Sequence, residues 1–443
     1  MINLHPALPW GDGPELITAS VTLGVPHPPG YPLYVLLGHL AYLVPIGNAA
    51  TRLNLFSAFC GASGLALLRW SLSLLTKDPS DIVSRAAYTA GTLLLGTLSV
   101  YFSAARSTEV YALFAVFVSV CILLVFRFWR ERSISGHLIW FVSGLAILHH
   151  YLILPLLVWL ILRARKWNPV CALIPLALVF VPLIRSQAGV ELDWYHPADL
   201  RSLGRLFLGG EFAQNLATGW AVFRMHPVQS VAAAGTGLLS VWGFFLPFVC
   251  LGAWSLLRRS RVRAFEYLVV LFAYALFYLF YLVGDREVFL LPFAILATPL
   301  LCLGVEWTID AVGRSLSPRG RNLFCVLVLL VPFLHAQLAT LSLEETDPME
   351  AFRYSDRVLD VLPPNAVLLA GLHEPSQDNE VFPLVYQQIV EHRRPDVDVI
   401  GTGFLALPWY REALTRRGLE LDLKELSLGK YTSAREWYVD VWR

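Results

Sequence analysis

Long apolar segments, separated by short polar loops, follow one another along the first three quarters of the chain. Eight of them reach or approach the roughly 20 residues that a helix needs to cross a bilayer, and they cover 54–76, 86–104, 109–126, 168–185, 236–257, 264–283, 288–306 and 322–341. Beyond residue 342 the apolar segments are shorter. The pattern predicts a polytopic α-helical membrane module over residues 1–342 and a small C-terminal α/β domain outside the membrane over residues 343–443.

Within that C-terminal part, two kinds of spacing alternate. Phe352–Leu362 and Phe382–Glu391 have the apolar spacing of helices, whereas Asn365–Leu369 and Asp396–Thr402 have the pattern of short strands. The domain could guide an acceptor or serve only as a scaffold, and the sequence leaves both roles open.

Composition supports the division into two parts. Hydrophobic residues make up 56% of the 443 residues and charged residues 15%, against about 25% charged residues in a soluble domain. Residues 343–443 hold 29 of the 67 charged residues, which leaves 38 for the first 342. Two or three soluble domains are therefore excluded, and the net charge of +1 gives no indication of a nucleic-acid partner.

Basic residues predict which ends of the spans face the cytoplasm, because Lys and Arg collect in short cytoplasmic loops. The chain has four clusters of basic residues. If all four are cytoplasmic, the outer side of the membrane holds residues 187–234, residues 284–287 and the C-terminal domain. In a bacterial cell, this corresponds to a multi-pass protein of the inner membrane with an extracytoplasmic C-terminal domain. The four clusters are Arg127, Arg130 and Arg132; Arg163, Arg165 and Lys166; Arg258, Arg259, Arg261 and Arg263; and Arg314, Arg319 and Arg321.

Two shorter apolar stretches need a different interpretation. Residues 137–162 lie between two basic clusters, and as one helix they would reach only about 39 Å, too short for two crossings. We expect a re-entrant hairpin with His149 and His150 near its tip. Residues 31–46 are also too short to cross, so residues 1–53 are expected to form an outer loop with interfacial helices. Met1 would then begin outside without a preceding span, which favours an amino-terminal helix missing from this chain.

With the sides assigned in this way, ionisable residues that are far apart in sequence share the outer face. Such residues are costly at membrane depth, so each is a functional candidate. Each also has a purely structural interpretation. Asp12 and Glu15 could form a helix capping box with Pro14, and His149 and His150 could be core histidines. Arg106 and Glu109 could form a surface ion pair, and residues 285–287 could be a solvated turn. Their convergence on one face is what favours a site, whose members are Asp12, Glu15, Arg106, Glu109, His149, His150, Asp285, Arg286 and Glu287.

Motifs along nearly the whole chain resemble those of a large family of bacterial membrane proteins. The most specific is Gly11-Asp12-Gly-Pro-Glu15-Leu-Ile17, followed by Thr22-Leu-Gly-Val-Pro-His27-Pro-Pro-Gly-Tyr31-Pro-Leu-Tyr34. Weaker matches are Glu109-Val-Tyr111, His149-His150, Trp194-x-x-Pro197, Gly284-Asp285-x-Glu287-x-Phe289-x-x-Pro292, Leu362-Pro-Pro-Asn365 and Arg394-Pro-Asp396-Val397. An animal relative of this family is an endoplasmic-reticulum O-mannosyltransferase of plexin-type domains.

The resemblance implies a GT-C glycosyltransferase, which takes a sugar from a polyprenyl-phosphate carrier. It implies a membrane-embedded catalytic module over residues 1–342, a mannosyl donor, and Asp12 at the catalytic position with Glu15 beside it. Partners would be the lipid-linked sugar, membrane lipid, and an extracytoplasmic protein or glycan acceptor. The sequence departs from its relatives at residues 374–379, which read Glu-Pro-Ser-Gln-Asp-Asn where relatives tend to show a Gly-Asp-Asn-Asp-like run.

Glycosyl transfer needs a base for the acceptor hydroxyl and cations for the leaving phosphate. We expect Asp12 to be the base of an inverting displacement, and Glu15 or Glu109 to orient the acceptor or a divalent cation, whose requirement the sequence leaves open. Arg106 and Arg286 are the expected phosphate ligands, with the remaining binding contacts expected from His27, Tyr31, His149, His150, Asp285 and Glu287. Two other classes fit the same pattern: a transporter or flippase of lipid-linked sugars, and a structural membrane protein. No convincing internal repeat supports the transporter.

Overall fold

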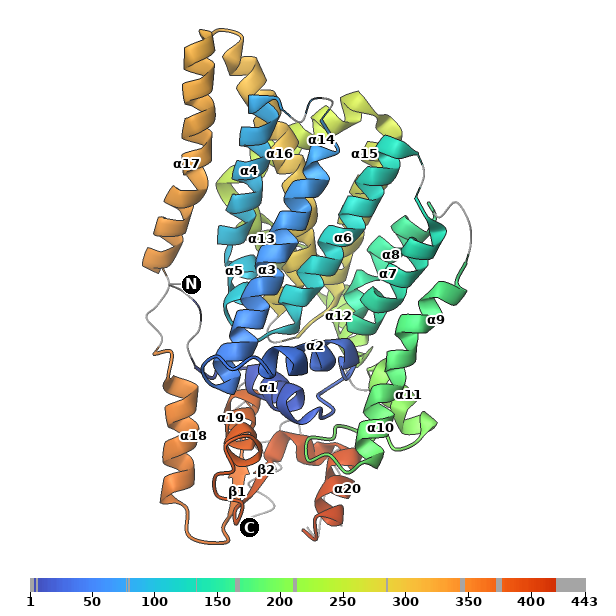
Figure 1. Ribbon diagram of the computed structural model, residues 1–443, viewed down its shortest axis with the longest axis vertical. Coiled ribbons are helices and arrows are strands. Elements are labelled where there is room, and N and C mark those ends of the chain that lie inside the picture. Colours follow the sequence, from blue (N-terminus) through green and yellow to red (C-terminus); the bar gives the residue numbers. More distant parts are fainter. Residues whose placement is uncertain are drawn as a thin grey trace.

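The computed structural model describes residues 4, 7–76, 78, 80–132, 134–163, 168–209, 213–283, 286–342, 347–371 and 377–419. Long helices run side by side in an elongated bundle (Figure 1). At one end of the bundle lie the short helices α1 (Gly13–Thr22) and α2 (Pro32–Tyr42), and the C-terminal elements lie next to them (Figure 1).

Among the described residues, seven helical segments are long and apolar enough to cross a membrane: Ala49–Ser73, Val110–Glu131, Val170–Gln187, Pro227–Arg259, Arg261–Phe280, Arg286–Gly313 and Pro318–Leu338. A helix satisfies all of its interior backbone groups internally, as a bilayer core requires. The chain is therefore a polytopic α-helical membrane protein, as the apolar pattern predicts. The helices are α3 (Ala49–Ser73), α4 (Ile82–Thr97), α5 (Ser99–Arg106), α6 (Val110–Glu131), α7 (Gly136–His149), α8 (Leu154–Ile161), α9 (Val170–Leu176), α10 (Val181–Gln187), α11 (Leu200–Leu208), α12 (Ala213–Met225), α13 (Pro227–Trp242), α14 (Leu246–Arg259), α15 (Arg261–Phe280), α16 (Leu291–Gly313) and α17 (Pro318–Ser342).

The segment 86–104, expected as an eighth span, is divided between α4 and α5. The break falls at Leu98, whose φ of −67° and ψ of 137° are extended rather than helical. α4 has 16 residues, so it rises about 24 Å, less than the thickness of a hydrocarbon core. α5 then leads to Arg106 at the α1 end of the bundle (Figure 1).

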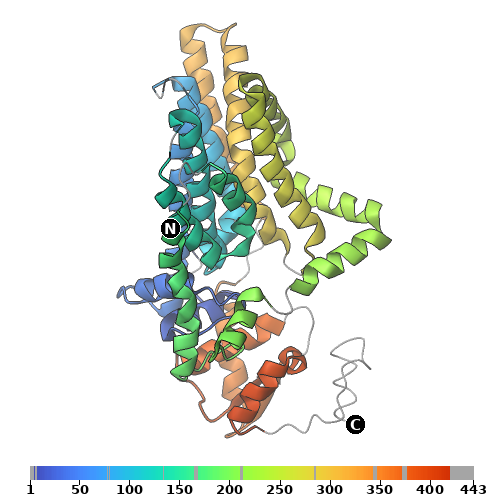
Figure 2. The same cartoon turned by 90° about the vertical axis from the view of Figure 1, so that its right-hand side faces the viewer.

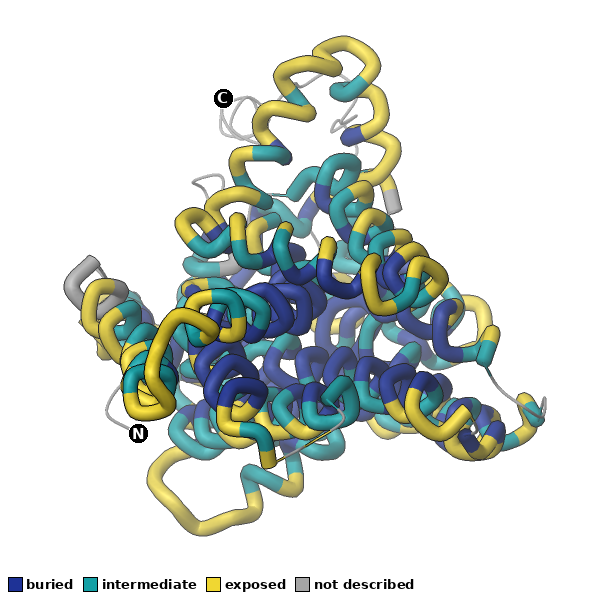
Figure 3. Tube along the Cα trace, turned by 90° about the horizontal axis from the view of Figure 1, so that it is seen from above, coloured by how far each residue is buried: buried dark blue, intermediate teal, exposed yellow. Residues whose placement is uncertain are grey.

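Buried side chains join the helices into one core, which lies at the centre when the molecule is seen along the bundle (Figure 3). Its members come chiefly from α4, α6, α8, α15 and α16. At the side of the bundle, α12 and α13 project away from the other helices (Figure 2). Exposed apolar residues on the outer helices, such as Phe59 at 70% and Phe265 at 70%, are in keeping with a surface that faces lipid.

The described members of the four basic clusters, which are all of them except Arg165 and Lys166, lie at the end of the bundle opposite α1 (Figure 1). Arg263 Nη2 donates to the Trp129 carbonyl at 2.9 Å, which joins the α14–α15 turn to the end of α6. Arg163 forms an ion pair with Glu266 near the start of α15. Arg321, in the fourth cluster, lies against Gly313 at the end of α16.

The stretch 137–162 forms two short helices, α7 and α8, joined by η1 (Tyr151–Ile153). The chain leaves helical geometry at His150, whose φ of −162° and ψ of 133° are extended. Both helices pack beside α6 on the same side of the bundle (Figure 1). His149 and His150 therefore lie at the turn between them.

The C-terminal part consists of α18 (Glu350–Val361), β1 (Val367–Ala370), α19 (Gln377–Ile389), β2 (Asp398–Gly401), η6 (Thr402–Ala406) and α20 (Pro408–Arg416). β1 and β2 are parallel, with Val367 opposite Asp398 and Ala370 opposite Gly401. Parallel neighbours need a crossover connection, and α19 provides it. This α/β arrangement agrees with the helix–strand–helix–strand order that the spacing predicts.

This C-terminal part shares its hydrophobic core with the start of the chain. Phe382 of α19 belongs to the same buried cluster as Ala19 of α1, Val25 and Trp194. A second shared cluster contains Ile17 of α1 and Tyr386 of α19. α1 is therefore held between the membrane helices on one side and the C-terminal elements on the other (Figure 1).

Candidate functional site

Asp12 stands directly before α1, with a helical φ of −74° and ψ of −11°. Its carbonyl accepts the first helical hydrogen bond from Leu16 N at 2.9 Å, but within the described residues its side chain makes no capping hydrogen bond. α1 therefore begins as that interpretation predicts, with Asp12 at the N-cap and Pro14 in the first turn, but the side-chain hydrogen bonds of a capping box are not made among the described residues. The side chain of Asp12 is 35% exposed.

Glu15 turns away from the helix end and binds His27 instead. Its carboxylate is fully buried, accepts the His27 amide at 3.0 Å, and lies 2.5 Å from His27 Nδ1. When Glu15 is ionised its carboxylate only accepts hydrogen bonds, and Nδ1 is then the donor of this contact. The other nitrogen, Nε2, lies 3.7 Å from Asp12 Oδ2. Glu15, His27 and Asp12 thus form a chain that leads from a buried acid to a partly exposed one.

Tyr31 lies beside this chain and connects it to other elements. The backbone reaches it through a cis Pro28–Pro29 bond and Gly30 at a φ of 79°. Its ring packs edge-on to His27, with 5.3 Å between centroids. Burial raises the pKa of the Tyr31 hydroxyl well above its usual value, and the carboxylates of Asp12, Glu109 and Glu15 and the hydroxyl of Tyr281 raise it further. The phenol therefore lies near three of the acidic residues that the sequence singles out.

The two histidines of the α7–α8 turn face the same tyrosine. Their ring centroids lie 6.3 Å (His149) and 6.1 Å (His150) from the Tyr31 ring. His149 Nε2 donates to the Val110 carbonyl at 3.0 Å, whereas its buried Nδ1 has no hydrogen-bond partner within the described residues. His150 Nδ1 accepts from Leu152 N at 3.1 Å. His149 is thus a buried core histidine with one satisfied nitrogen.

The expected cations lie at the ends of α5 and η5 (Arg286–Leu290), two elements that contact each other. Arg106 stacks over Phe102 at 5.9 Å, and its buried Nε has no hydrogen-bond partner among the described residues. Arg286 stacks over Tyr278 at 5.0 Å. Phe289 of η5 packs against Tyr111 with 6.0 Å between ring centroids, which places η5 beside the start of α6.

The structure does not bring every expected residue into contact. Asp12, Glu15, His27, Tyr31, Glu109, His149 and His150 converge, whereas Arg106 and Arg286 are joined to them only through neighbouring elements. Glu287 is exposed, and Asp285 lies outside the described residues. In the part of the chain that the structure describes, no group of three or more His, Cys, Asp or Glu side chains is arranged to hold a metal ion.

Two asparagines hold the site together and escape the sequence interpretation. Asn379 of α19 accepts a 2.6 Å hydrogen bond from the amide of Gly11, the residue before Asp12. Asn54, buried in α3, accepts from the amide and the hydroxyl of Thr108 at 2.8 and 2.7 Å and donates to the Ala7 carbonyl at 3.0 Å. A buried amide in a spanning helix is a signal that could have identified Asn54. Asn379 could have been found only through the run at residues 374–379.

Comparison with known proteins gives two family matches. Residues 12–170 match the N-terminal domain of the protein O-mannosyl-transferase TMEM260, and residues 351–430 match the TMEM260-associated domain 2. The first match begins at Asp12 and includes His27, Glu109, His149 and His150. The second contains Asn379.

Two curated relatives align with most of the chain. The mouse protein O-mannosyl-transferase TMEM260 is 25% identical over 465 aligned residues, which cover 94% of this chain and 62% of the mouse protein. The protein O-mannosyl-transferase tmem260 of Dictyostelium discoideum is 20% identical over 474 aligned residues, which cover 92% of this chain and 56% of that protein. The chain thus spans about three fifths of the length of the relatives it matches. With both domains present in their order, the chain is related to the animal protein O-mannosyl-transferases of the TMEM260 family.

Proposed function

We propose that this protein is a membrane glycosyltransferase that moves mannose from a polyprenyl-phosphate carrier to a hydroxyl of an extracytoplasmic protein or glycan. The relatives' names support the transfer of mannose to protein hydroxyls. The observation that carries the proposal is the Glu15–His27–Asp12 chain, which presents one partly exposed carboxylate at the end of the membrane bundle.

In this proposal Asp12 acts as the general base. It takes the proton of the acceptor hydroxyl while the acceptor oxygen bonds to the anomeric carbon. The bond between that carbon and the phosphate oxygen breaks, its electron pair leaves with the polyprenyl phosphate, and the anomeric centre is inverted. His27, held by the buried Glu15, keeps Asp12 in place and offers Nε2 as the next group along the chain.

The leaving phosphate gains negative charge, so it needs donors. Tyr31 is one, since a phenol whose pKa lies above its usual value of about 10 is protonated at neutral pH and has a proton to donate. Arg106 and Arg286 supply the charge, since a guanidinium can bind phosphate through two hydrogen bonds. His149 and His150 line the same region with Glu109. A lipid-linked donor fits this location because its prenyl chain remains in the bilayer while the headgroup reaches Asp12.

The C-terminal elements complete the proposal as the side from which the acceptor enters. α18 and α19 contact the segment before α1, where Trp10 Nε1 donates to Glu350 at 3.2 Å and Gly11 donates to Asn379. If the basic clusters are cytoplasmic, these elements are extracytoplasmic, the compartment in which a secreted acceptor is found.

The decisive experiment replaces Asp12 with Asn in a strain that lacks the chromosomal gene, and compares mannosylated extracytoplasmic proteins with and without the variant. We expect Asp12→Asn to abolish the product although the protein reaches the membrane in normal amount. Glu131→Gln is the matched control, because that exposed acid pairs with Arg127 on α6 and leaves the product unchanged. Full activity of Asp12→Asn would exclude this residue as the base.

A second experiment tests the donor. Membranes from the complemented strain are given either polyprenyl-phosphate-mannose or a nucleotide-linked mannose, in extracts unable to convert one into the other. Transfer from the lipid-linked donor alone is expected. Transfer from the nucleotide sugar would remove the reason for placing the site at the membrane boundary.

A further inference from the structure

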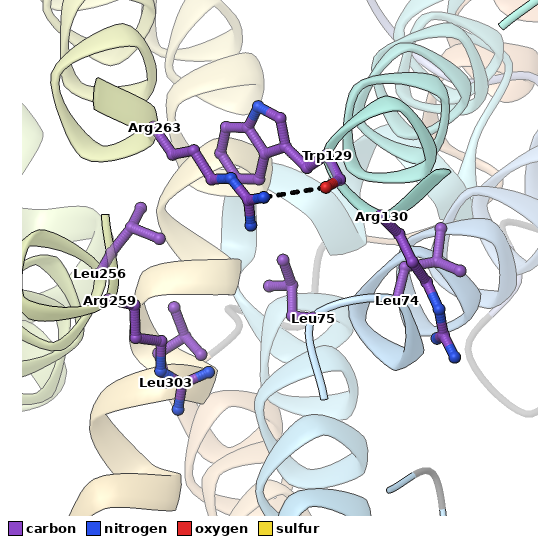
Figure 4. Close-up of a pocket in the computed structure, with 8 residues that line it drawn as sticks. All are labelled: Leu74, Leu75, Trp129, Arg130, Leu256, Arg259, Arg263 and Leu303. Carbon is purple, nitrogen blue, oxygen red and sulfur yellow. Dashed lines mark hydrogen bonds between the residues drawn. The ribbon is translucent and has the colours of Figure 1, made fainter. Parts of the chain in front are cut away.

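A small cavity lies at the end of the bundle opposite Asp12, where two of the basic clusters meet. Its volume is about 60 Å³. It is enclosed by residues that follow α3 and by residues of α6, α14, α15 and α16. The eight lining residues, drawn in Figure 4, are Leu74, Leu75, Trp129, Arg130, Leu256, Arg259, Arg263 and Leu303.

The protein neutralises the positive charge of this lining only in part. Three of the eight residues are arginines, and none of the eight is acidic. The nearest acid is Glu306, whose Oε2 accepts from Arg259 Nη2 at 2.6 Å while its Oε1 accepts from the hydroxyls of Ser84 and Tyr88. That single carboxylate is fully engaged and compensates one guanidinium.

The other two arginines are oriented by neutral groups. Arg263 donates to the Trp129 carbonyl at 2.9 Å and stacks on the Trp129 ring at 5.5 Å. Arg130 donates to the Ser73 carbonyl at 3.3 Å. Two further acids of this end form ion pairs with arginines that do not line the cavity, Glu131 with Arg127 and Glu266 with Arg163. Among the described residues, neither Arg130 nor Arg263 forms an ion pair with a carboxylate, so neither has a direct counter-charge at the cavity.

We infer that this cavity binds the phosphate of an anionic phospholipid from the leaflet at this end of the bundle. The volume of about 60 Å³ is far below the roughly 300–1,000 Å³ of a pocket that encloses a whole small molecule, so only a compact group enters. Arginine binds phosphate oxygens in a planar, two-pronged geometry. A membrane lipid fits better than a soluble anion because four leucines line the cavity, and because α14 and α15, which contribute to the lining, also expose Leu257, Val262 and Phe265, apolar side chains that acyl chains can cover.

The experiment compares the binding of phosphatidylglycerol and phosphatidylcholine to the purified full chain in detergent, by native mass spectrometry across a lipid titration. The test variant is Arg130→Gln/Arg263→Gln, which leaves the Arg259–Glu306 pair intact. The matched control is Arg258→Gln, an arginine of the same end that stacks over Trp254 at 5.4 Å and does not line the cavity.

We expect the wild type and Arg258→Gln to retain phosphatidylglycerol at least tenfold more strongly than phosphatidylcholine, and the double variant to lose that preference. Equal retention of the two lipids by the wild type, or an unchanged preference in the double variant, overturns the inference. A second measurement uses the wild type alone and so does not depend on the folding of a variant. Phosphatidylglycerol is expected to raise the Tm of the wild type, and glycerol 1-phosphate is expected to leave it unchanged. Equal stabilisation by glycerol 1-phosphate would show that the cavity binds soluble anions, and it would contradict the assignment of the cavity to a phospholipid.

Discussion

At the scale of single residues, the local sequence around Asp12 permits two arrangements, and the folded chain selects one of them. Asp12-Gly-Pro-Glu15 has the residues of a helix capping box. His27 competes for Glu15 by offering two donors, its amide and its imidazole, inside a dry environment where both bonds are strong. The same carboxylate cannot reach back to the Asp12 amide, so Asp12 is left as the acid that faces solvent.

Tyr31 gives a prediction with a defined pH dependence. The pKa of Tyr31 in the folded protein lies above the unfolded value of about 10. The phenol is therefore protonated at every pH below about 10. Any stability that this pKa shift contributes is fully present below a pH of about 10 and is lost as the pH rises through the folded-state pKa. We expect Tyr31→Phe to lower mannosyl transfer about tenfold or more, by the same factor at pH 6.5 and pH 9. Rates measured at both values test this, and a loss that disappears at pH 9 would contradict a role for the protonated hydroxyl.

At the scale of elements, α1 is positioned by a close contact between its first residues and the loop before α6. A Cβ atom at Gly13 would collide with the ring of Pro9 and lie 3.2 Å from the Thr108 carbonyl, in the loop that Asn54 anchors to α3. The start of α1 can therefore lie against the loop before α6 only because residue 13 has no side chain. This contact brings Asp12 and Glu109, which are nearly a hundred residues apart, to the same tyrosine.

Replacing this glycine tests the packing of α1. We expect Gly13→Ala to destabilise the protein by about 1–3 kcal/mol, because the added methyl group overpacks the contact. Gly235→Ala in α13 is the matched control: nothing lies within 4 Å of its added Cβ, so the better helix propensity of Ala should leave the stability unchanged or raise it slightly. Thermal unfolding of the two purified variants is compared. Equal melting temperatures would show that the contact at Gly13 does not hold α1 in place.

At the scale of the whole molecule, the C-terminal elements and the membrane helices share hydrophobic clusters that include α1. The acid-bearing segment is consequently fixed from both sides. Hydrogen bonds also tie the segment before α1 to the C-terminal elements, from Trp10 Nε1 to Glu350 and from Gly11 N to Asn379 Oδ1. The Gly11–Asn379 bond joins the residue directly before the first matched family domain to a residue within the second one.

Asn379 is expected to act as a positioning residue for Asp12. Asn379→Ala should lower kcat about tenfold with little change in KM, and it should cost only about 0.5–1.5 kcal/mol of stability, the net value of one hydrogen bond. Asn379→Asp keeps an oxygen acceptor for the Gly11 amide and should restore most of the activity. If Asp fails to rescue, or if KM rises while kcat is unchanged, the residue contributes to binding or folding instead.

The arrangement of charge along the bundle predicts its orientation. The acid cluster and the basic clusters lie at opposite ends, so single cysteines at positions 12 and 258 should be reached from opposite sides of the membrane. In intact cells, and with Cys250 and Cys171 replaced, a membrane-impermeant maleimide should label Asp12→Cys and not Arg258→Cys. Labelling of both, or of position 258 alone, would contradict an extracytoplasmic site.

The sequence alone determined the class of protein and the order of its parts. Apolar length and charge density are local properties, and they predict the spanning helices, the α7–α8 region and the helix–strand–helix–strand order after residue 342. Tertiary structure decided which distant residues contact one another. Glu15 binds His27 rather than its own helix, the helix breaks at Leu98, and Asn379 reaches Gly11. These outcomes depend on hydrogen bonds and packing between distant residues, which compete with local preferences and are settled only when the elements come together.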